Sequence, residues 1–343
     1  MSDAGGCYRL IGINSSPYSV KVRAMLRYRR IPFLWVRRDA AASREIAHIR
    51  PAVIPVLQTP DGEYLVDSTP MALELERRVV NDRSILPEDP AQAFLALLIE
   101  DFADEWVTKA MFHYRWWYEA DRRFAAGWVI GDRLLGAPRA EREAAGAAFN
   151  DRQVGRMALV GCTAGNRPLI EAGYRQLLAV LERGFEDQPF LFGTRPSIAD
   201  FALYGQLMIL ATDPTPAAVM RAEAPSLLPW LLRLDDLSGH DGAWLPTPSR
   251  ATTDLLDLVG RCYLPFLAAN AAAFAEGREA FEVELDGHPY RQGTFRYQVK
   301  CLDTLRHCFA ALPTDARRRL EPLLSAAGCL NLLSKPLHQG AAA

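Results

Sequence analysis

The sequence lacks any arrangement of cysteine or histidine that marks a disulfide framework or a metal site. Its six cysteines are scattered without C-x-x-C spacing, and its six histidines form no array with metal-ligand spacing. A disulfide-stapled domain or a structural zinc site would need such spacing. We therefore expect reduced thiols and no bound metal.

The sequence also lacks a long apolar run and a large excess of one charge. No stretch reaches the roughly 18 uninterrupted apolar residues of a membrane-spanning helix, and "MSDAGGCYRLIGINSS" at the start has no basic region followed by an apolar core. The net charge is −2 and 23% of the residues are charged, unlike a protein that binds a polyanion. These absences predict a cytoplasmic protein with no membrane span and no nucleic-acid partner.

The first eighty residues instead alternate strand and helix patterns. Apolar runs at 8–13 and 31–38 flank a helical pattern at 17–29, and a weaker helix follows at 40–50. The segment "VIPVLQTPDGEYLVDS" then holds two apolar runs joined by Thr-Pro-Asp-Gly, which predicts an antiparallel pair. With a helix at 69–80, the order is βαβαββα, and we assign 1–82 to one domain.

The remainder of the chain has a helical period, which predicts an α+β protein with segregated parts. We expect a linker at 83–90, an all-α domain at 91–245, and a mostly helical extension at 246–343 with a short β-hairpin near 281–293. At roughly 150 residues per domain, 343 residues suit two or three domains. The expected helices lie at 91–125, 139–160, 168–186, 198–211, 225–238, 252–275, 294–311 and 315–327.

The stretch "NSSPYSVKV" places Ser16 and Pro17 where the first helix begins. Ser is a favoured N-cap and Pro a favoured first helical residue, so helix initiation alone explains the pair. The same helix end follows the first strand of an α/β layer, where ligands commonly lie. Its free N–H groups and partial positive charge would favour a thiolate over a thiol.

Two further segments carry polar groups or a special backbone near the strand ends. In "VIPVL", a cis bond before Pro55 would turn the backbone of Ile54 outward to pair with an extended peptide, whereas the base rate favours trans. In "VDSTP", Ser68 is a plausible N-cap, and the same geometry could hold a carboxylate while Asp67 pairs with an ammonium. Both the structural and the binding interpretation remain open for these residues.

In order and spacing, these segments resemble the glutathione transferase superfamily over roughly residues 8–240. The resemblance includes "FGTRPSIADFALYGQL", in which Ser197 and Asp200 match a capping box that serves folding. It implies a thioredoxin-like first domain, glutathione as co-substrate, and a homodimer. It also implies that Ser16 stabilises the glutathione thiolate, that Ile54 before Pro55 pairs with the cysteinyl unit, and that Asp67 and Ser68 receive the γ-glutamyl end.

Departures from the family pattern limit the reactions and ligand contacts that we expect at this site. Ser19 stands where glutaredoxin-like relatives have their second Cys, so disulfide exchange at this site is not expected. The segment "RPAVIPV" lacks the Lys and Gly of many relatives, which leaves the contact to the glycyl carboxylate open among Arg37, Arg38, Arg44 and His48. Ser15 is the neighbour that could take the place of Ser16.

The electrophile is expected beside the first helix after the linker. In "DEWVTKAMFHYRWWYEADRRF", Trp106, Ala110, His113 and Trp117 share one face, with Tyr114 beside them, and such a stripe could be either core or pocket wall. We assign these five residues, together with Tyr18, to the substrate pocket.

The prediction is a glutathione transferase-like enzyme that directs the thiolate at a small hydrophobic electrophile. A lyase, isomerase or dehalogenase would use the same thiolate, and a non-catalytic relative whose extension binds another protein is the alternative from a different class.

Overall fold

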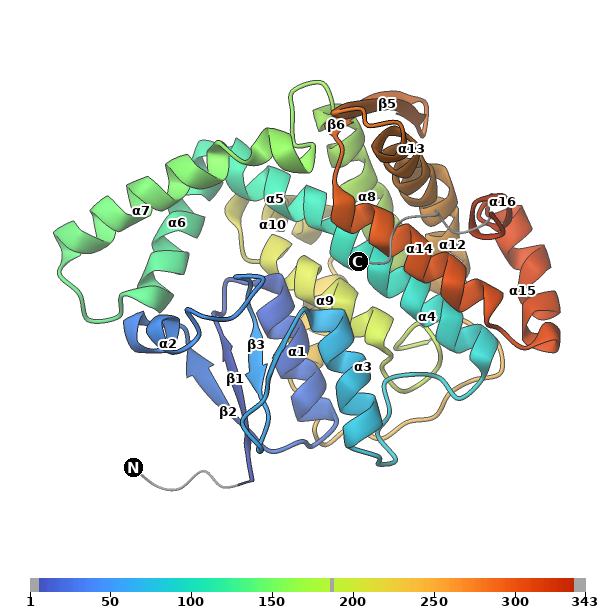
Figure 1. Cartoon of the computed structure of the whole chain (residues 1–343), viewed down its shortest axis with the longest axis horizontal. Coiled ribbons are helices and arrows are strands. Elements are labelled where there is room, and N and C mark those ends of the chain that lie inside the picture. The colour runs from blue at the N-terminus through green and yellow to red at the C-terminus, as the bar shows by residue number, and fades with distance from the viewer. Residues whose placement is uncertain (1–5, 186–187, 336–343) are drawn as a thin grey trace.

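The computed structural model describes residues 6–185 and 188–335, in which a small sheet domain packs beneath a larger helical body (Figure 1). The sheet contains β1 (Tyr8–Gly12), β2 (Phe33–Arg37), β3 (Val56–Gln58) and β4 (Tyr64–Val66) in the order β2-β1-β3-β4. β1 and β2 are parallel, and the other two pairs are antiparallel. This thioredoxin-like arrangement confirms the predicted fold class, including the antiparallel pair around Thr-Pro-Asp-Gly.

Successive residues of the strands face opposite sides of the sheet, as the two-residue repeat of a strand requires. Leu10 and Leu57 belong to the large core on the side of α1 (Pro17–Tyr28) and α3 (Ser68–Arg78). Ile11 and Val56 instead belong to a small separate core with α2 (Ala40–Glu45). The near-continuous apolarity of β1 thus reflects burial on both faces.

The helical body begins with α4 (Pro90–Phe102), a π-helical turn η1 (Ala103–Val107) and α5 (Thr108–Trp117). The expected helix over 91–125 is wrong in one respect, because the chain breaks at Tyr118, which is extended (φ −88°, ψ 140°), before α6 begins. The Tyr118 hydroxyl donates to Glu171 at 2.6 Å, so a tertiary contact sets the break. The body continues with α6 (Glu119–Arg133), α7 (Arg139–Val154), η2 (Met157–Val160), α8 (Arg167–Gly184), α9 (Ile198–Leu210), α10 (Pro214–Glu223) and α11 (Leu227–Leu234).

The sequence pattern did not predict α10, because its Pro214 and Pro216 suggest a loop. Both prolines lie in the first helical turn, where a missing N–H costs nothing.

The C-terminal part returns along α4 rather than extending away from it (Figure 1). It comprises α12 (Arg250–Leu258), η3 (Val259–Tyr263), α13 (Leu264–Ala275), β5 (Ala280–Leu285), β6 (His288–Gly293), α14 (Arg296–Ala310), α15 (Thr314–Ala326) and α16 (Leu330–Leu333). β5 and β6 form an antiparallel hairpin. Phe94 of α4 packs on Phe309 of α14 with ring centroids 5.4 Å apart, so the extension shares the main core.

Within the described residues, one helical stretch, Arg250–Ala275, is long and apolar enough to cross a membrane by length and composition. Of its most apolar window 61% is buried inside the protein, as in the core helix of a globular protein.

The sheet domain is held against the helical body through α1 and α9. Gly205 of α9 approaches α1 so closely that a Cβ at this position would lie 2.7 Å from the carbonyl oxygen of Pro17. Lys21 of α1 is fully buried and reaches Glu100 at 2.5 Å and Asp104 at 2.6 Å in the helical body. These contacts place the start of α1 at the junction of the two parts.

Candidate functional site

The loop after β1 positions two adjacent serines at the start of α1. Ser16 is the N-cap, and its Oγ accepts a hydrogen bond from the Ser19 N–H at 3.3 Å, with Pro17 as the first helical residue. Ser16 is only 6% exposed, and Ser15 beside it has a buried Oγ without a partner in the described structure. Arg115 of α5 donates to the Ser15 carbonyl at 2.8 Å, which ties this loop to the helical body.

Both serines border a cavity of about 690 Å³ between the sheet domain, the helical body and the extension. The Ile54–Pro55 peptide bond is cis, so the isomer that the sequence left open is decided, and Ile54 borders the same cavity. The structure therefore brings Ser16 and Ile54 together, as the resemblance implied. Tyr18 also borders the cavity, and its hydroxyl donates to the backbone oxygen of Asp104 at 2.9 Å.

Asp67 and Ser68 lie at the start of α3 but do not line this cavity in the described structure. Asp67 has a left-handed backbone (φ 70°), unusual for a residue other than glycine, and its carboxylate accepts a hydrogen bond from the Tyr297 hydroxyl at 2.8 Å. Tyr297 belongs to α14 and does line the cavity. The extension thus contacts the residue expected to receive the γ-glutamyl ammonium, which the sequence did not indicate.

The Ser68 hydroxyl is buried in a charged cluster beneath the cavity. It donates to Asp104 at 3.2 Å and accepts from Lys21 at 3.4 Å. Burial raises the pKa of Asp104 to about 7 even though Lys21 opposes the change, and Glu100 adds to the rise. Burial by itself would lower the pKa of Lys21, but the two carboxylates outweigh it and raise that pKa. The cluster is therefore a tightly coupled ion network at the junction of the two parts.

The predicted aromatic wall lies in the helical core instead of facing the cavity. His113 is fully buried, and its Nε2 lies 2.9 Å from Glu171, while its ring packs on Trp117 and Tyr114. Burial lowers the pKa of His113, which suits a neutral, hydrogen-bonded residue. Trp106 and Ala110 border a gap of only about 30 Å³ between α5 and α8. None of these five residues lines the 690 Å³ cavity in the described structure, because the stripe packs against other helices.

A neighbouring face of the same helix borders the cavity. This face contributes Glu105, Thr108, Lys109 and Phe112 to the lining. Apolar side chains between α5 and η2 and four residues of the extension line the rest of this side of the cavity. The apolar wall comprises Met111, Phe112, Trp116, Val129, Phe149, Leu159 and Val160, and the extension contributes Gln292, Phe295, Tyr297 and Gln298. The sequence reasoning missed Lys109; a lone Lys in an apolar helical segment was the signal that could have found it.

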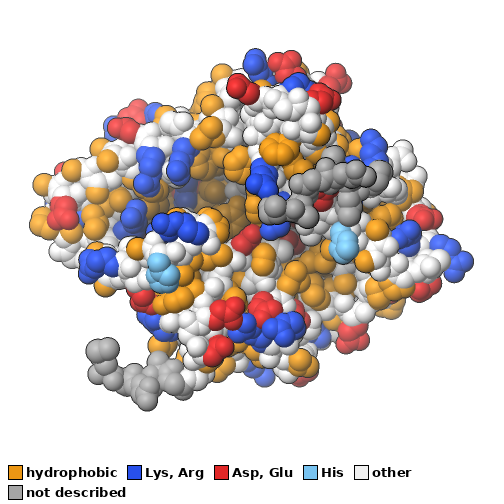
Figure 2. Space-filling view, in the orientation of Figure 1, with side chains coloured by type: hydrophobic (Ala, Val, Ile, Leu, Met, Phe, Trp, Pro, Cys, Tyr) orange, Lys and Arg blue, Asp and Glu red, His pale blue; other side chains and the backbone are white. Residues whose placement is uncertain are grey.

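Positive charge gathers around this cavity. Arg38, at the end of β2, is the only one of the four candidates for the glycyl carboxylate that lines the cavity among the described residues. Burial lowers the pKa of the Arg38 guanidinium, with Arg133 and Arg152 adding to the effect. The face of the molecule drawn in Figure 2 has a hollow with Lys and Arg side chains along its rim.

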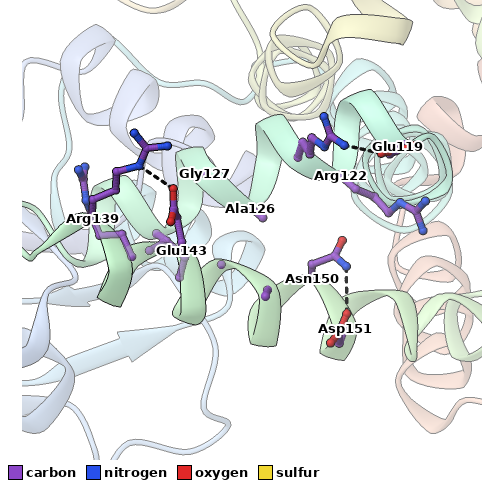
Figure 3. A pocket seen from close by; sticks show the side chains of 13 residues that line it. Glu119, Arg122, Ala126, Gly127, Arg139, Glu143, Asn150 and Asp151 are labelled. Carbon is purple, nitrogen blue, oxygen red and sulfur yellow. Dashed lines mark hydrogen bonds and ion pairs between the residues drawn. The ribbon is translucent and has the colours of Figure 1, made fainter.

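A second depression, of about 890 Å³, runs between α6 and α7 and is drawn in Figure 3. Two arginines of its lining pair with glutamates of their own helices, Arg139 with Glu143 at 2.7 Å and Arg123 with Glu119 at 2.7 Å. Both pairs are largely exposed to solvent. We therefore place the candidate site at Ser16 and not in this groove.

A comparison with solved structures finds similar chains that cover about two thirds of this one. A glutathione S-transferase from Methylobacterium radiotolerans, in complex with glutathione sulfonate, is 23% identical and covers 70% of this chain and 96% of its own, with a TM-score of 0.42. A glutathione S-transferase from Methylobacillus flagellatus with glutathione bound is 23% identical, with coverages of 66% and 92% and a TM-score of 0.39. The β-etherase LigF from Sphingobium is 20% identical, with coverages of 66% and 94% and a TM-score of 0.47.

A comparison with curated proteins finds no match. Family models are more informative, and they match both parts of the chain that were expected to carry the family pattern. The glutathione S-transferase N-terminal domain matches residues 15–78, and the glutathione S-transferase C-terminal domain matches residues 140–245. With the thioredoxin-like sheet, the cis Ile54–Pro55 bond and the Ser-capped α1 in place, the chain belongs to the glutathione transferase superfamily.

Proposed function

We propose that this protein binds glutathione at the start of α1 and directs its sulfur at an electrophile in the 690 Å³ cavity. One observation carries the proposal: the capped end of α1, with Ser16 and the backbone of Ile54, opens on a large cavity with an apolar wall. A helix N-terminus and a hydroxyl donor both stabilise a thiolate. Catalysis would then consist of thiol activation and proximity.

The chemical step balances without any further reactant. The glutathione thiol loses its proton to solvent, the sulfur lone pair forms a C–S bond, and the leaving group departs with its bonding electrons. A free thiol titrates near about 8.5, so a pKa lower by about one unit raises the thiolate fraction several-fold at neutral pH. A glutathione-dependent lyase, isomerase or dehalogenase would begin with the same thiolate.

Each end of glutathione has a proposed partner. The guanidinium of Arg38 would hold the glycyl carboxylate, since it borders the same cavity as Ile54 and has no carboxylate partner in the described structure. Asp67 would receive the γ-glutamyl ammonium. Its Oδ2 is taken by Tyr297, but a carboxylate has about four acceptor positions and can hold both groups.

A matched set of serine variants tests the proposal. Calorimetry with glutathione and a thiolate absorbance scan against pH would be run on wild type, Ser16→Ala, Ser15→Ala and Ser249→Ala. Ser249 caps α12 through the Thr252 N–H at 3.1 Å and lies outside the site, so it reproduces the loss of a cap alone. We expect Ser16→Ala to raise the pKa of bound glutathione by about one unit and to lower activity near neutral pH about tenfold. Ser249→Ala should change neither.

The same experiment can overturn the proposal. If glutathione does not bind wild type at millimolar concentration, the enzyme proposal fails. If only Ser15→Ala moves the thiol pKa, the role passes to Ser15, which borders the same cavity and whose Oγ has no partner in the described structure.

The second candidate is a non-catalytic binding protein of the same superfamily. The specific observation in its favour is the contact of Tyr297 with Asp67, together with the engagement of the Ser68 hydroxyl by Asp104. If glutathione binds neither wild type nor Tyr297→Phe, this candidate is favoured. A homodimer is the oligomeric state that we propose for either function, and sedimentation of the intact chain measures it.

A further inference from the structure

Lys109 of α5 is a buried cation that the proposed thiol chemistry does not use. It is 3% exposed, and its Nζ donates to the Val160 carbonyl at 3.1 Å and to Gln292 Oε1 at 2.7 Å. The ammonium also lies 4.5 Å from the ring centroid of Phe266. Lys109 nevertheless lines the 690 Å³ cavity, so its surroundings combine an apolar shell with access to the proposed substrate site.

No carboxylate forms an ion pair with Lys109 in the described part of the chain. Glu105, one helical turn earlier, lines the same cavity, but burial together with Asp101 and Asp104 raises its pKa and disfavours its negative charge. The other titratable groups that face Lys109 are Cys162, whose Sγ donates to the Lys109 carbonyl, and Tyr290 of β6. Burial raises the pKa of both, so neither supplies a negative charge near neutral pH.

Burial lowers the pKa of Lys109 to about 8, so most molecules still carry the Lys109 proton near neutral pH. A buried charge without a counter-ion is costly, and residues with strongly perturbed pKa values cluster at functional sites.

Apart from Glu105, the acidic and basic residues that line the cavity with Lys109 are arginines. Arg156 of the η2 segment and Arg38 line the cavity without an ion pair among the described residues, whereas Arg115 is neutralised by Asp213 at 2.7 Å. Arg38 is already assigned to glutathione, and Lys109 and Arg156 belong to the helical body. The part of the cavity left for the electrophile is therefore apolar and positively charged.

We propose that the electrophile is an apolar organic anion, an aromatic carboxylate or sulfonate, and that Lys109 is its counter-ion. The inference rests on the proposed function and specifies its substrate class. Gln292, which accepts from Lys109 and from Tyr290, holds the ammonium in place, so the extension helps to build the electrophile site. Arg156 at the rim adds to the attraction of an anion.

A pair of electrophiles that differ only in charge tests the proposal. Chlorodinitrobenzoate and its methyl ester have the same leaving group and nearly the same shape. We would measure kcat/KM for both with wild type, Lys109→Met, Lys109→Arg and the control Arg139→Gln, whose residue pairs with exposed Glu143 away from the cavity. A hydrogen-bonded ion pair corresponds to roughly a tenfold to hundredfold effect. We expect Lys109→Met to lower kcat/KM for the acid by that factor and for the ester much less, and Lys109→Arg to restore part of the loss.

Two results would overturn this inference while leaving the proposed function intact. Equal losses of kcat/KM for acid and ester in Lys109→Met, which leave the acid-to-ester ratio unchanged, would mean that Lys109 only supports the fold. No loss of kcat/KM for the acid would mean that Lys109 is no counter-ion. If Lys109→Met does not fold, Arg156→Gln at the exposed rim takes its place and should lower the acid-to-ester ratio several-fold; an unchanged ratio there also refutes the proposal.

Binding of anilinonaphthalene sulfonate, followed by fluorescence, gives a readout that needs no turnover. We expect Lys109→Met to weaken its binding about tenfold and Arg139→Gln to leave it unchanged. Equal binding by wild type and Lys109→Met would refute the anion site. Failure of wild type to bind glutathione, in contrast, would refute the proposed function and with it the electrophile role, while the fluorescence assay would still report whether Lys109 holds an anion.

Discussion

Replacement of Lys109 by Met should stabilise the protein near neutral pH, although it removes two hydrogen bonds. The pKa of Lys109 falls from an ordinary 10.5 to about 8 on burial, and that difference corresponds to about 3 kcal/mol of unfavourable free energy for the charged form in the folded state. Met fills a similar volume without a charge. Two neutral partners, the Val160 carbonyl and Gln292, lose a donor at about 1 kcal/mol each, so a net gain of about 1 kcal/mol remains.

The pH dependence of this gain follows from where the proton is lost. Below about pH 8 both the folded and the unfolded chain keep the Lys109 proton, so the full cost of the buried charge is present. Between about 8 and 10.5 the folded protein has lost the proton and the unfolded chain has not, so the cost shrinks by about 1.4 kcal/mol per pH unit. The advantage of Lys109→Met should therefore be largest at low pH and reverse in sign by about pH 9.5.

Urea unfolding of wild type and Lys109→Met near pH 7 and near pH 9.5 measures this difference directly. Lys300→Met is the matched control, because Lys300 is exposed on α14 and its replacement should have little effect at either pH. A difference between wild type and Lys109→Met that stays constant over this range would refute the reasoning, since it would show that Lys109 does not lose its proton early in the folded protein.

Three further perturbations test the contacts that position the site. Lys21→Met leaves Asp104 and its neighbouring carboxylate buried without a cation. We expect a loss of about 3–5 kcal/mol in urea unfolding near pH 8.5, above the pKa of Asp104 of about 7, and a smaller loss near pH 5, where Asp104 is protonated; an equal loss at both would contradict this. Tyr297→Phe removes the hydroxyl that donates to the carboxylate of Asp67. Calorimetry should then show severalfold tighter glutathione binding, whereas weaker binding would mean that the Tyr297 hydroxyl contributes to binding glutathione. Asp200→Ala removes the carboxylate that accepts from the Ser197 N–H in the capping box and from the Leu191 N–H. Thermal unfolding should show a loss of about 1–3 kcal/mol with an unchanged glutathione Kd, and a changed Kd would place this residue in the site.

Much of the sheet domain, and the Ser16 side of the candidate site, could be predicted from residues that are close together in the sequence. A Ser followed by Pro strongly favours a helix start, and "TPDGEY" strongly favours a tight turn, so Ser16 and the antiparallel pair were placed correctly. The capping box of Ser197 and Asp200 is likewise formed by residues three positions apart. Such features depend on neighbours along the chain, which is why they could be predicted.

Contacts between distant segments decided the rest. The helical segment from α4 to α5 is apolar on several faces, so its hydrophobic period does not predict which face packs in the core and which borders the cavity. In the structure His113 lies in the core and Lys109 borders the cavity. The cis bond between Ile54 and Pro55 could not be predicted from the sequence, since the base rate favours trans. Tyr297 reaches Asp67 from 230 positions away, and no local pattern encodes that meeting. The sequence by itself determined where α1 begins, because a Ser cap and a Pro act locally, and only the tertiary structure decided which charges and side chains surround that helix end.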